Sequence, residues 1–276
     1  MMMSLIVCLP RIIDLTTHPT HRCMDGTVML IGYGSGVGGL QASVLTLSTQ
    51  VKCIKYIKGL AWSPTGPILA AASADGTVVV TKVSNLQQSG HVTVEVVQQL
   101  NLSGIPESIC FSGDGTKLIC YIRDTPYLSY FDLENQFELT KINLNKGSGG
   151  GFEDHVSYAV MDMAISPNGK FLALATDTSR NIVIDAVTGK QIRNLYGHTN
   201  DGFSNPRIAW SSNGQYVFGN TQEDGSVCVW DVASSSIVKR LEGHTSPVRG
   251  LCSSHLSNTL VTTSFDKQTK IWLTPM

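Results

Sequence analysis

The chain has 276 residues, of which 42% are hydrophobic and only 15% are charged. Its 20 basic and 21 acidic residues give a formal net charge of −1, so no overall field would draw it to nucleic acid or to an acidic membrane surface. Because an average globular protein has roughly 25% charged residues, this composition, with 26 glycines, favours a β-rich fold with many tight turns.

The N-terminal segment predicts strands. Its first apolar stretch, residues 1–10, lacks a preceding basic region and is too short to span a bilayer, so we interpret Ser4–Leu9 as a strand. Further strands are expected over Ile12–Pro19, Thr27–Tyr33 and Leu40–Leu47.

The glycine run 34–39 matches the pattern GxGxxG. A dinucleotide site requires a helix that opens at the third glycine, whereas Leu40–Leu47 reads as another strand. The run therefore predicts a glycine-rich hairpin loop.

A short motif then recurs along the chain: a small or apolar residue, an apolar residue, serine, two turn residues and glycine. Its copies are Ala61–Gly66, Cys110–Gly115, Ala164–Gly169, Ala209–Gly214 and a degraded copy, Cys252–Asn258. Successive copies begin 43 to 54 residues apart, and the wider gaps contain insertions such as the glycine-rich segment 146–151. A four-stranded repeat of about 40–45 residues is typical of a propeller blade.

Asp-Gly pairs at 75–76 and 224–225 lie between alternating apolar runs, which is a strong hairpin signal. With the N-terminal strands counted as one more copy, the repeats number six. The expected fold is all-β: a β-propeller of four-stranded antiparallel blades, with six blades or as an incomplete seven-bladed ring, forming one domain over residues 1–276. Ser4–Leu9 would complete the last blade and so remove exposed strand edges.

The last two repeats resemble the WD40-repeat family, whose repeat has Gly-His near its start, an Asp in a tight turn and Trp-Asp at its end. In the family, the His, Ser, Asp and Trp of a repeat form a buried hydrogen-bond chain. The resemblance implies such a structural set at His244, Ser264, Asp266 and Trp272, and a partial one at His198, Asp224 and Trp230. The two turn aspartates and the two tryptophans are each 42 residues apart, which supports this register.

Ser264, His244 and Asp266 could instead form a hydrolase triad. The repeat register accounts for all three residues, and no nucleophile-elbow sequence surrounds the serine. The seven cysteines include no CxxC pair. We therefore expect no catalytic residues, no cofactor and no metal site.

Basic residues are scattered. Strand alternation would place Lys52 and Lys58 on one face and Lys55 on the other, as in a solvated outer strand. Arg240 and Arg249 flank the last Gly-His pair. Neither group indicates a nucleic-acid or membrane site.

WD40 proteins bind peptides or domains on the narrow face around the central channel, through the loops that enter each first strand and the residue before the turn Asp. By position, the resemblance implies a partner-binding face at Thr245, Ser246, Pro247 and Phe265 in the last repeat, and at Asn200, Asp201, Phe203 and Glu223 in the preceding one. Phe203 and Phe265 would be the aromatic anchors if they are exposed, or would pack into neighbouring loops if they are not.

We therefore expect a non-enzymatic scaffold or adaptor that binds other proteins or peptides, as a monomeric propeller within a larger complex of the cytoplasm or nucleus. One alternative is a propeller enzyme or small-molecule binder, which would need polar groups that converge on the channel. Another is a fragment, or a propeller that serves only to assemble a larger complex.

Overall fold

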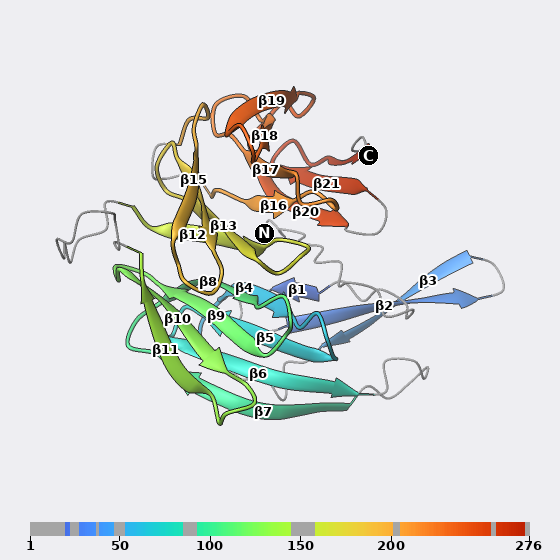
Figure 1. Cartoon of the computed structure of the whole chain (residues 1–276). Helices are drawn as coiled ribbons and strands as arrows, with labels where there is room; N and C mark the ends of the chain where they lie inside the picture. The colour runs from blue at the N-terminus through green and yellow to red at the C-terminus, as the bar shows by residue number, and fades with distance from the viewer. Residues whose placement is uncertain are drawn as a thin grey trace.

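The computed structural model describes residues 20–22, 28–36, 39–46, 53–84, 93–144, 158–200, 205–254 and 258–273, with side chains from residue 53 onward. The regular structure in these residues is entirely β, in six antiparallel sheets, so the expected all-β class is confirmed (Figure 1). The described part contains no helix long and apolar enough to cross a membrane.

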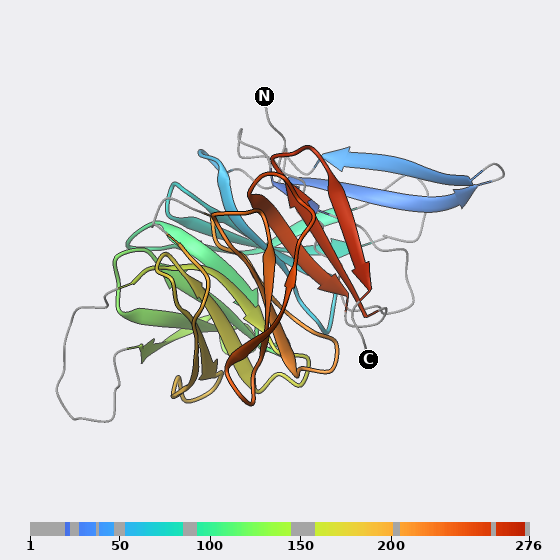
Figure 2. The same ribbon diagram turned by 90° about the horizontal axis from the view of Figure 1, so that it is seen from above.

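Five of the sheets are the blades of a β-propeller (Figures 1 and 2). The first two blades consist of β4 (Ile57–Trp62), β5 (Ile68–Ser73), β6 (Thr77–Ser84) and β7 (Thr93–Asn101), and of β8 (Pro106–Phe111), β9 (Lys117–Ile122), β10 (Tyr127–Asp132) and β11 (Glu138–Asn143). The next two consist of β12 (Val160–Ile165), β13 (Phe171–Thr176), β14 (Asn181–Asp185) and β15 (Gln191–Leu195), and of β16 (Ile208–Trp210), β17 (Tyr216–Asn220), β18 (Val227–Asp231) and β19 (Ser236–Leu241). The fifth has three strands: β20 (Val248–Ser254), β21 (Thr259–Ser264) and β22 (Thr269–Leu273).

The sixth sheet is N-terminal and is formed by β1 (Thr20–Arg22), β2 (Val28–Gly36) and β3 (Gly39–Thr46). β1 lies beside β4, and the hairpin of β2 and β3 extends away from the blades (Figures 1 and 2). Gly34 pairs with Gln41 and Gly36 with Gly39, so the GxGxxG run closes a β-hairpin, as expected, rather than opening a helix.

The expected count of six blades, and the alternative of an incomplete seven-bladed ring, are wrong: the structure has five blades, and one of them has three strands rather than four. The sequence prediction counted the N-terminal strands as a blade because they recur like the others. A blade, however, must also place an inner strand against the inner strands of its neighbours. The expected closing strand Ser4–Leu9 and the strand Ile12–Pro19 lie outside the described residues. In the described part, β22 is an edge strand with Ile271 and Leu273 exposed.

Most of the hydrophobic core lies at the interfaces between neighbouring blades, and a further cluster lies within the first blade. Val78 of the first blade, for example, packs in one cluster with Leu118 of the second. Ala173 of the third blade packs with Trp210 and Trp230 of the fourth. A fully buried side chain of this kind contributes roughly 1.5–3 kcal/mol, so each blade depends on its neighbours for stability.

Small residues let the inner strands approach one another. A Cβ atom added at Gly59 would lie 3.2 Å from Cγ1 of Ile109 in the next blade. The first position of the recurring motif, two residues further along in each inner strand, is also small: it is Ala61, Cys110, Ala164, Ala209 and Cys252.

The rest of the motif forms a turn held by its own side chains. In the fourth blade, Ser211 Oγ donates to Asn213 Oδ1 at 2.7 Å, and the backbone N–H of Tyr216 donates to Ser211 Oγ at 2.9 Å. The second and third blades have the same turn, and there the backbones touch: a Cβ atom on Gly113 would lie 2.4 Å from Cα of Gly169.

We predict that Gly113→Ala destabilises the propeller by about 1–3 kcal/mol, because a methyl group at this contact forces two blades apart. Urea unfolding measures the change. Gly66→Ala is the matched control, since it lies in the equivalent turn of the first blade and has no atom within 4 Å of the added Cβ. Equal unfolding midpoints for the two variants would show that the turns do not touch.

Candidate functional site

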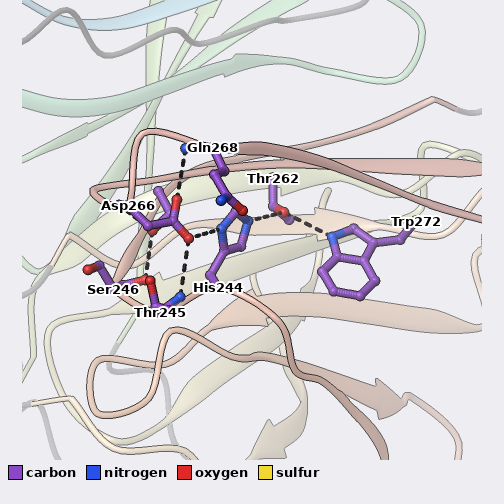
Figure 3. A network of polar contacts seen from close by, with 8 residues as sticks. His244, Thr245, Ser246, Thr262, Asp266, Gln268 and Trp272 are labelled. Carbon is purple, nitrogen blue, oxygen red and sulfur yellow. Dashed lines mark hydrogen bonds and ion pairs between the residues drawn. The ribbon is translucent and has the colours of Figure 1, made fainter.

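The last blade contains a buried chain of hydrogen bonds (Figure 3). His244 Nδ1 lies 2.7 Å from Asp266 Oδ2, and its Nε2 lies 2.8 Å from Oγ1 of Thr262. Trp272 Nε1 donates to the same hydroxyl oxygen at 2.9 Å. These hydrogen bonds connect the loop before β20 with β21, with β22 and with Asp266 in the turn between them. They therefore hold the last hairpin of the blade in place.

Donor and acceptor roles follow from the chemistry of the groups. An indole N–H only donates, so the Thr262 oxygen accepts from Trp272 and its own hydrogen is free to donate to His244 Nε2. Nδ1–H of the ring then donates to Asp266. Burial acts to raise the pKa of Asp266, but hydrogen bonds from Gln268 N, His244 and Thr245 N lower it to about 2, so the carboxylate is charged at neutral pH.

Ser264 lies beside this chain and not in it. Its hydroxyl donates to the carbonyl oxygen of Ser246 at 2.7 Å and accepts from Asp266 N at 3.1 Å. Thr262, which sequence reasoning missed, contacts His244 instead. The available signal was strand alternation, because Thr262 lies two residues after the buried Leu260 and therefore on the same face of β21.

Asp266, His244 and Thr262 contact one another as the carboxylate, imidazole and hydroxyl of a hydrolase triad do. The Thr262 hydroxyl, however, is completely buried and is bonded to Trp272. A nucleophile must reach its substrate, so this arrangement fits a structural role.

The preceding blade lacks the equivalent chain. His198 is buried and packs edge-on against Trp230 with ring centroids 5.2 Å apart, and among the described residues neither of its ring nitrogens has a hydrogen-bond partner. Asp224 accepts from Thr221 Oγ1 and Ser226 N instead, and Trp230 donates to the carbonyl oxygen of Tyr196. The structure therefore places His198 against Trp230 but does not bond it to Asp224.

Strand register explains the difference. Trp272 pairs with Leu260, and Trp230 pairs with Val217. Two residues further along, Thr262 of the last blade thus corresponds to Gly219, which has no hydroxyl. A Cβ atom on Gly219 would lie 3.0 Å from Cζ3 of Trp230, so glycine makes room for the indole and supplies no hydroxyl to His198.

We predict that Thr262→Val destabilises the protein by about 2–4 kcal/mol. The change keeps the side-chain shape but removes the hydrogen-bond partner of a buried nitrogen of His244 and of the partly buried indole nitrogen of Trp272, at about 1–3 kcal/mol each. Chemical denaturation measures the loss. Thr262→Ser keeps the hydroxyl and should cost only about 1 kcal/mol, for one methyl group; an equal loss in both variants would refute the role of the hydroxyl.

A second prediction concerns pH. Burial, with a smaller contribution from Arg240, lowers the pKa of His198 from 6.5 to about 4. The unfolded chain therefore takes up the His198 proton at a higher pH than the folded protein does. The free energy of unfolding is highest above pH 6.5 and decreases by up to about 3 kcal/mol as pH falls towards 4. His198→Phe keeps a ring against Trp230 and should flatten the stability curve over this interval; an unchanged acid slope would argue against a buried, neutral histidine.

The centre of the propeller holds a cavity of about 260 Å³. It is lined by inner-strand residues of all five blades, from β4, β8, β12, β16 and β20. The turns at Gly113 and Pro167 lie at one end of these strands, and charged residues lie at the other, where the strands begin. We call this second end the channel mouth and define it by Lys58, Glu107, Arg123, Asp162, Arg207 and Arg249.

A β-bulge lies near the start of four inner strands and sets the position of three of these side chains, Lys58, Glu107 and Arg249. The pairing skips one residue at Lys58, Glu107, Met161 and Arg249. A bulge redirects the side chain of the extra residue and bends the strand. The charged residues of the channel mouth are thus brought together from repeats that lie far apart in the sequence.

Two ion-pair groups join neighbouring blades at the channel mouth. Lys58 Nζ lies 2.7 Å from Oε2 of the buried Glu107, which also accepts from Arg123 at 3.1 Å. In the next two blades, Arg207 lies 3.5 Å from Asp162 Oδ1, and the backbone N–H of Ile208 donates to Asp162 Oδ2. Lys58 therefore belongs to an inner strand, which corrects the expectation of a solvated outer strand.

Arg249 of the fifth blade differs from these residues. Its guanidinium lies 4.6 Å from the ring centroid of Phe265, and no ion pair to a carboxylate forms among the described residues. Burial, followed by repulsion from Arg207, lowers the pKa of Arg249 below its usual value. Phe265, expected as an anchor, is 40% exposed.

The other residues expected on the partner-binding face fall in three places. Thr245 and Pro247 are exposed near Phe265, and the Pro247 carbonyl accepts from Phe265 N at 3.2 Å; Ser246 lies between them, half-buried. Glu223 is exposed in the β17–β18 turn, whereas Asn200 is half-buried and bonds to Thr176. Asp201 and Phe203 lie outside the described residues. Within the described part, no cluster of three His, Cys, Asp or Glu side chains could hold a metal.

Comparison with known proteins agrees with this architecture. The family model "WD domain, G-beta repeat" matches residues 43–81, 189–231 and 235–272. The second match covers β15 to β18, so a sequence repeat begins with the outer strand of one blade and continues into the next. The resemblance to the WD40-repeat family is confirmed: WD40 repeats match in three places of this chain, and the fold is a β-propeller.

Similar proteins cover only part of the chain. "DDB1- and CUL4-associated factor 10" of Xenopus tropicalis is 30% identical over 41% of this chain and 24% of its own length. "Protein hir1" of Schizosaccharomyces pombe is 29% identical over 41% of this chain and 14% of its own length. "WD repeat-containing protein VIP3" of Arabidopsis thaliana is 32% identical over 33% of this chain and 32% of its own length. The chain thus spans less than a third of each of these relatives.

A solved structure extends the fold similarity to most of the chain. A chain in "Crystal Structure of Mitotic Checkpoint Complex" superposes with a TM-score of 0.66 and 16% sequence identity. The match covers 94% of this chain and 72% of the other. At this identity the similarity concerns the fold alone.

Proposed function

We propose that this protein is a non-enzymatic scaffold that binds other proteins or peptides at the channel mouth. The observation that carries the proposal is the gathering of charged side chains around one end of the central cavity, beside the exposed Phe265. Aromatic and arginine side chains are the common anchors of protein interfaces. The residues expected on the partner-binding face, Thr245 to Pro247 and Phe265, lie at this end.

The names of similar proteins support the general role and not a particular partner. One relative is named as associated with DDB1 and CUL4, and the structural neighbour is part of a mitotic checkpoint complex. Both names describe proteins that work in assemblies. The proposal includes a monomeric propeller within such an assembly, in the cytoplasm or nucleus.

The internal chemistry favours a binding role over catalysis. The Thr262 hydroxyl, which has the contacts of a nucleophile, is buried against Trp272. The central cavity, at about 260 Å³, is below the roughly 300–1,000 Å³ of sites that enclose small ligands. The charged residues at its mouth are shared between blades, as in a surface that contacts a partner from outside.

Quantitative affinity capture from cell extract tests the proposal. Phe265→Ala should remove most of the proteins that the parent chain recovers, because loss of an interface anchor costs at least 2 kcal/mol, or about thirtyfold in affinity. Lys170→Ala is the control, since it is exposed at the start of β13, near the opposite end of the channel. Recovery of the same proteins at the same levels by both variants would overturn the proposal.

A further inference from the structure

Cations outnumber carboxylates among the side chains that define the channel mouth. The four cationic side chains, Lys58, Arg123, Arg207 and Arg249, face two carboxylates, Glu107 and Asp162. The turns at the same end of the blades carry further carboxylates, among them Asp75, Asp224 and Asp266, and each of these accepts a backbone hydrogen bond within its own turn.

The number of blades explains which cation lacks a partner. Lys58 and Glu107 occupy the bulge positions of the first two blades and pair with each other. Asp162 and Arg207 each lie two residues before the motif's small residue in the third and fourth blades, and they also pair. The fifth blade has no further neighbour of this kind in the described structure, so Arg249 is left with only the Phe265 ring.

The two neighbouring arginines also have unused donors. The Nε atoms of Arg207 and Arg249 are buried and have no hydrogen-bond partner in the described structure. The side chain of Arg207 is only 11% exposed, and its one ion pair is long, at 3.5 Å. A buried donor without an acceptor costs about 1–3 kcal/mol, so a carboxylate that reached this pair would relieve an existing cost.

Building on the proposed function, we propose that Arg207 and Arg249 bind a carboxylate side chain of an acidic partner segment at the channel mouth. A guanidinium presents two parallel N–H donors that match the two oxygens of a carboxylate. Phe265 supports the Arg249 guanidinium from one side through its ring. The site is compact and contains two carboxylates of its own, which suits a peptide side chain better than the continuous phosphate backbone of a nucleic acid.

Fluorescence anisotropy with a labelled hexaglutamate peptide tests the inference directly. The parent protein should bind this peptide more tightly at low than at high salt, and should not bind a hexaserine peptide. The double variant Arg207→Gln and Arg249→Gln should weaken binding at least tenfold. Arg193→Gln, an exposed arginine on the outer strand β15, should bind like the parent.

A variant with the opposite effect separates binding from misfolding. Asp162→Asn keeps an oxygen that can accept from Ile208 N but frees Arg207 from its ion pair. It should bind hexaglutamate several-fold more tightly than the parent, a gain that a damaged fold would not produce. Unchanged binding in both the double arginine variant and Asp162→Asn would overturn the site, as would tighter binding of a single-stranded oligonucleotide than of the peptide.

The two proposals can fail separately. If partner capture requires Phe265 but hexaglutamate does not bind, the acidic-segment inference is wrong and the scaffold role stands. If hexaglutamate binds through Arg207 and Arg249 but partner capture is indifferent to Phe265→Ala, the anion site stands and the proposed docking role of this face is wrong.

Discussion

The structure depends on the close packing of five inner strands around one axis. Successive inner strands contact one another from β4 through β8, β12 and β16 to β20. Most of the apolar clusters lie between successive blades. Small residues at the first motif position, and glycine at positions such as Gly59 and Gly113, set how near the blades can come. This packing brings residues from repeats about 45 residues apart to the same level of the channel.

The same packing produces the candidate site. Bulges near the starts of β4, β8 and β20 redirect Lys58, Glu107 and Arg249, and Asp162 and Arg207 lie near the starts of β12 and β16. The charges of these residues decide whether neighbouring blades attract one another. Opposite charges join the first blade to the second and the third to the fourth. Among the described residues, Arg249 of the fifth blade has no ionic partner and contacts the Phe265 ring instead.

The repeat motif predicted the class of fold and the turns, because it carries residues with strong local preferences. It could not predict the number of blades, because the strands of a separate hairpin and those of a blade show the same alternation of apolar and polar residues. Ser264 and Thr262 illustrate a similar limit: both are hydroxyl residues on the same face of β21, and only the packing decides which one meets His244. Lys58 was expected on an outer strand because alternation does not reveal the bulge that redirects its side chain.

An anion-binding surface at the inner-strand starts of the fourth and fifth blades would be visible by amide hydrogen exchange with and without saturating hexaglutamate. We expect added protection confined to the backbone near Arg207, Arg249 and Phe265, with no change in the outer strands β7, β11, β15 and β19. Protection on those outer strands, or none near the two arginines, would contradict it.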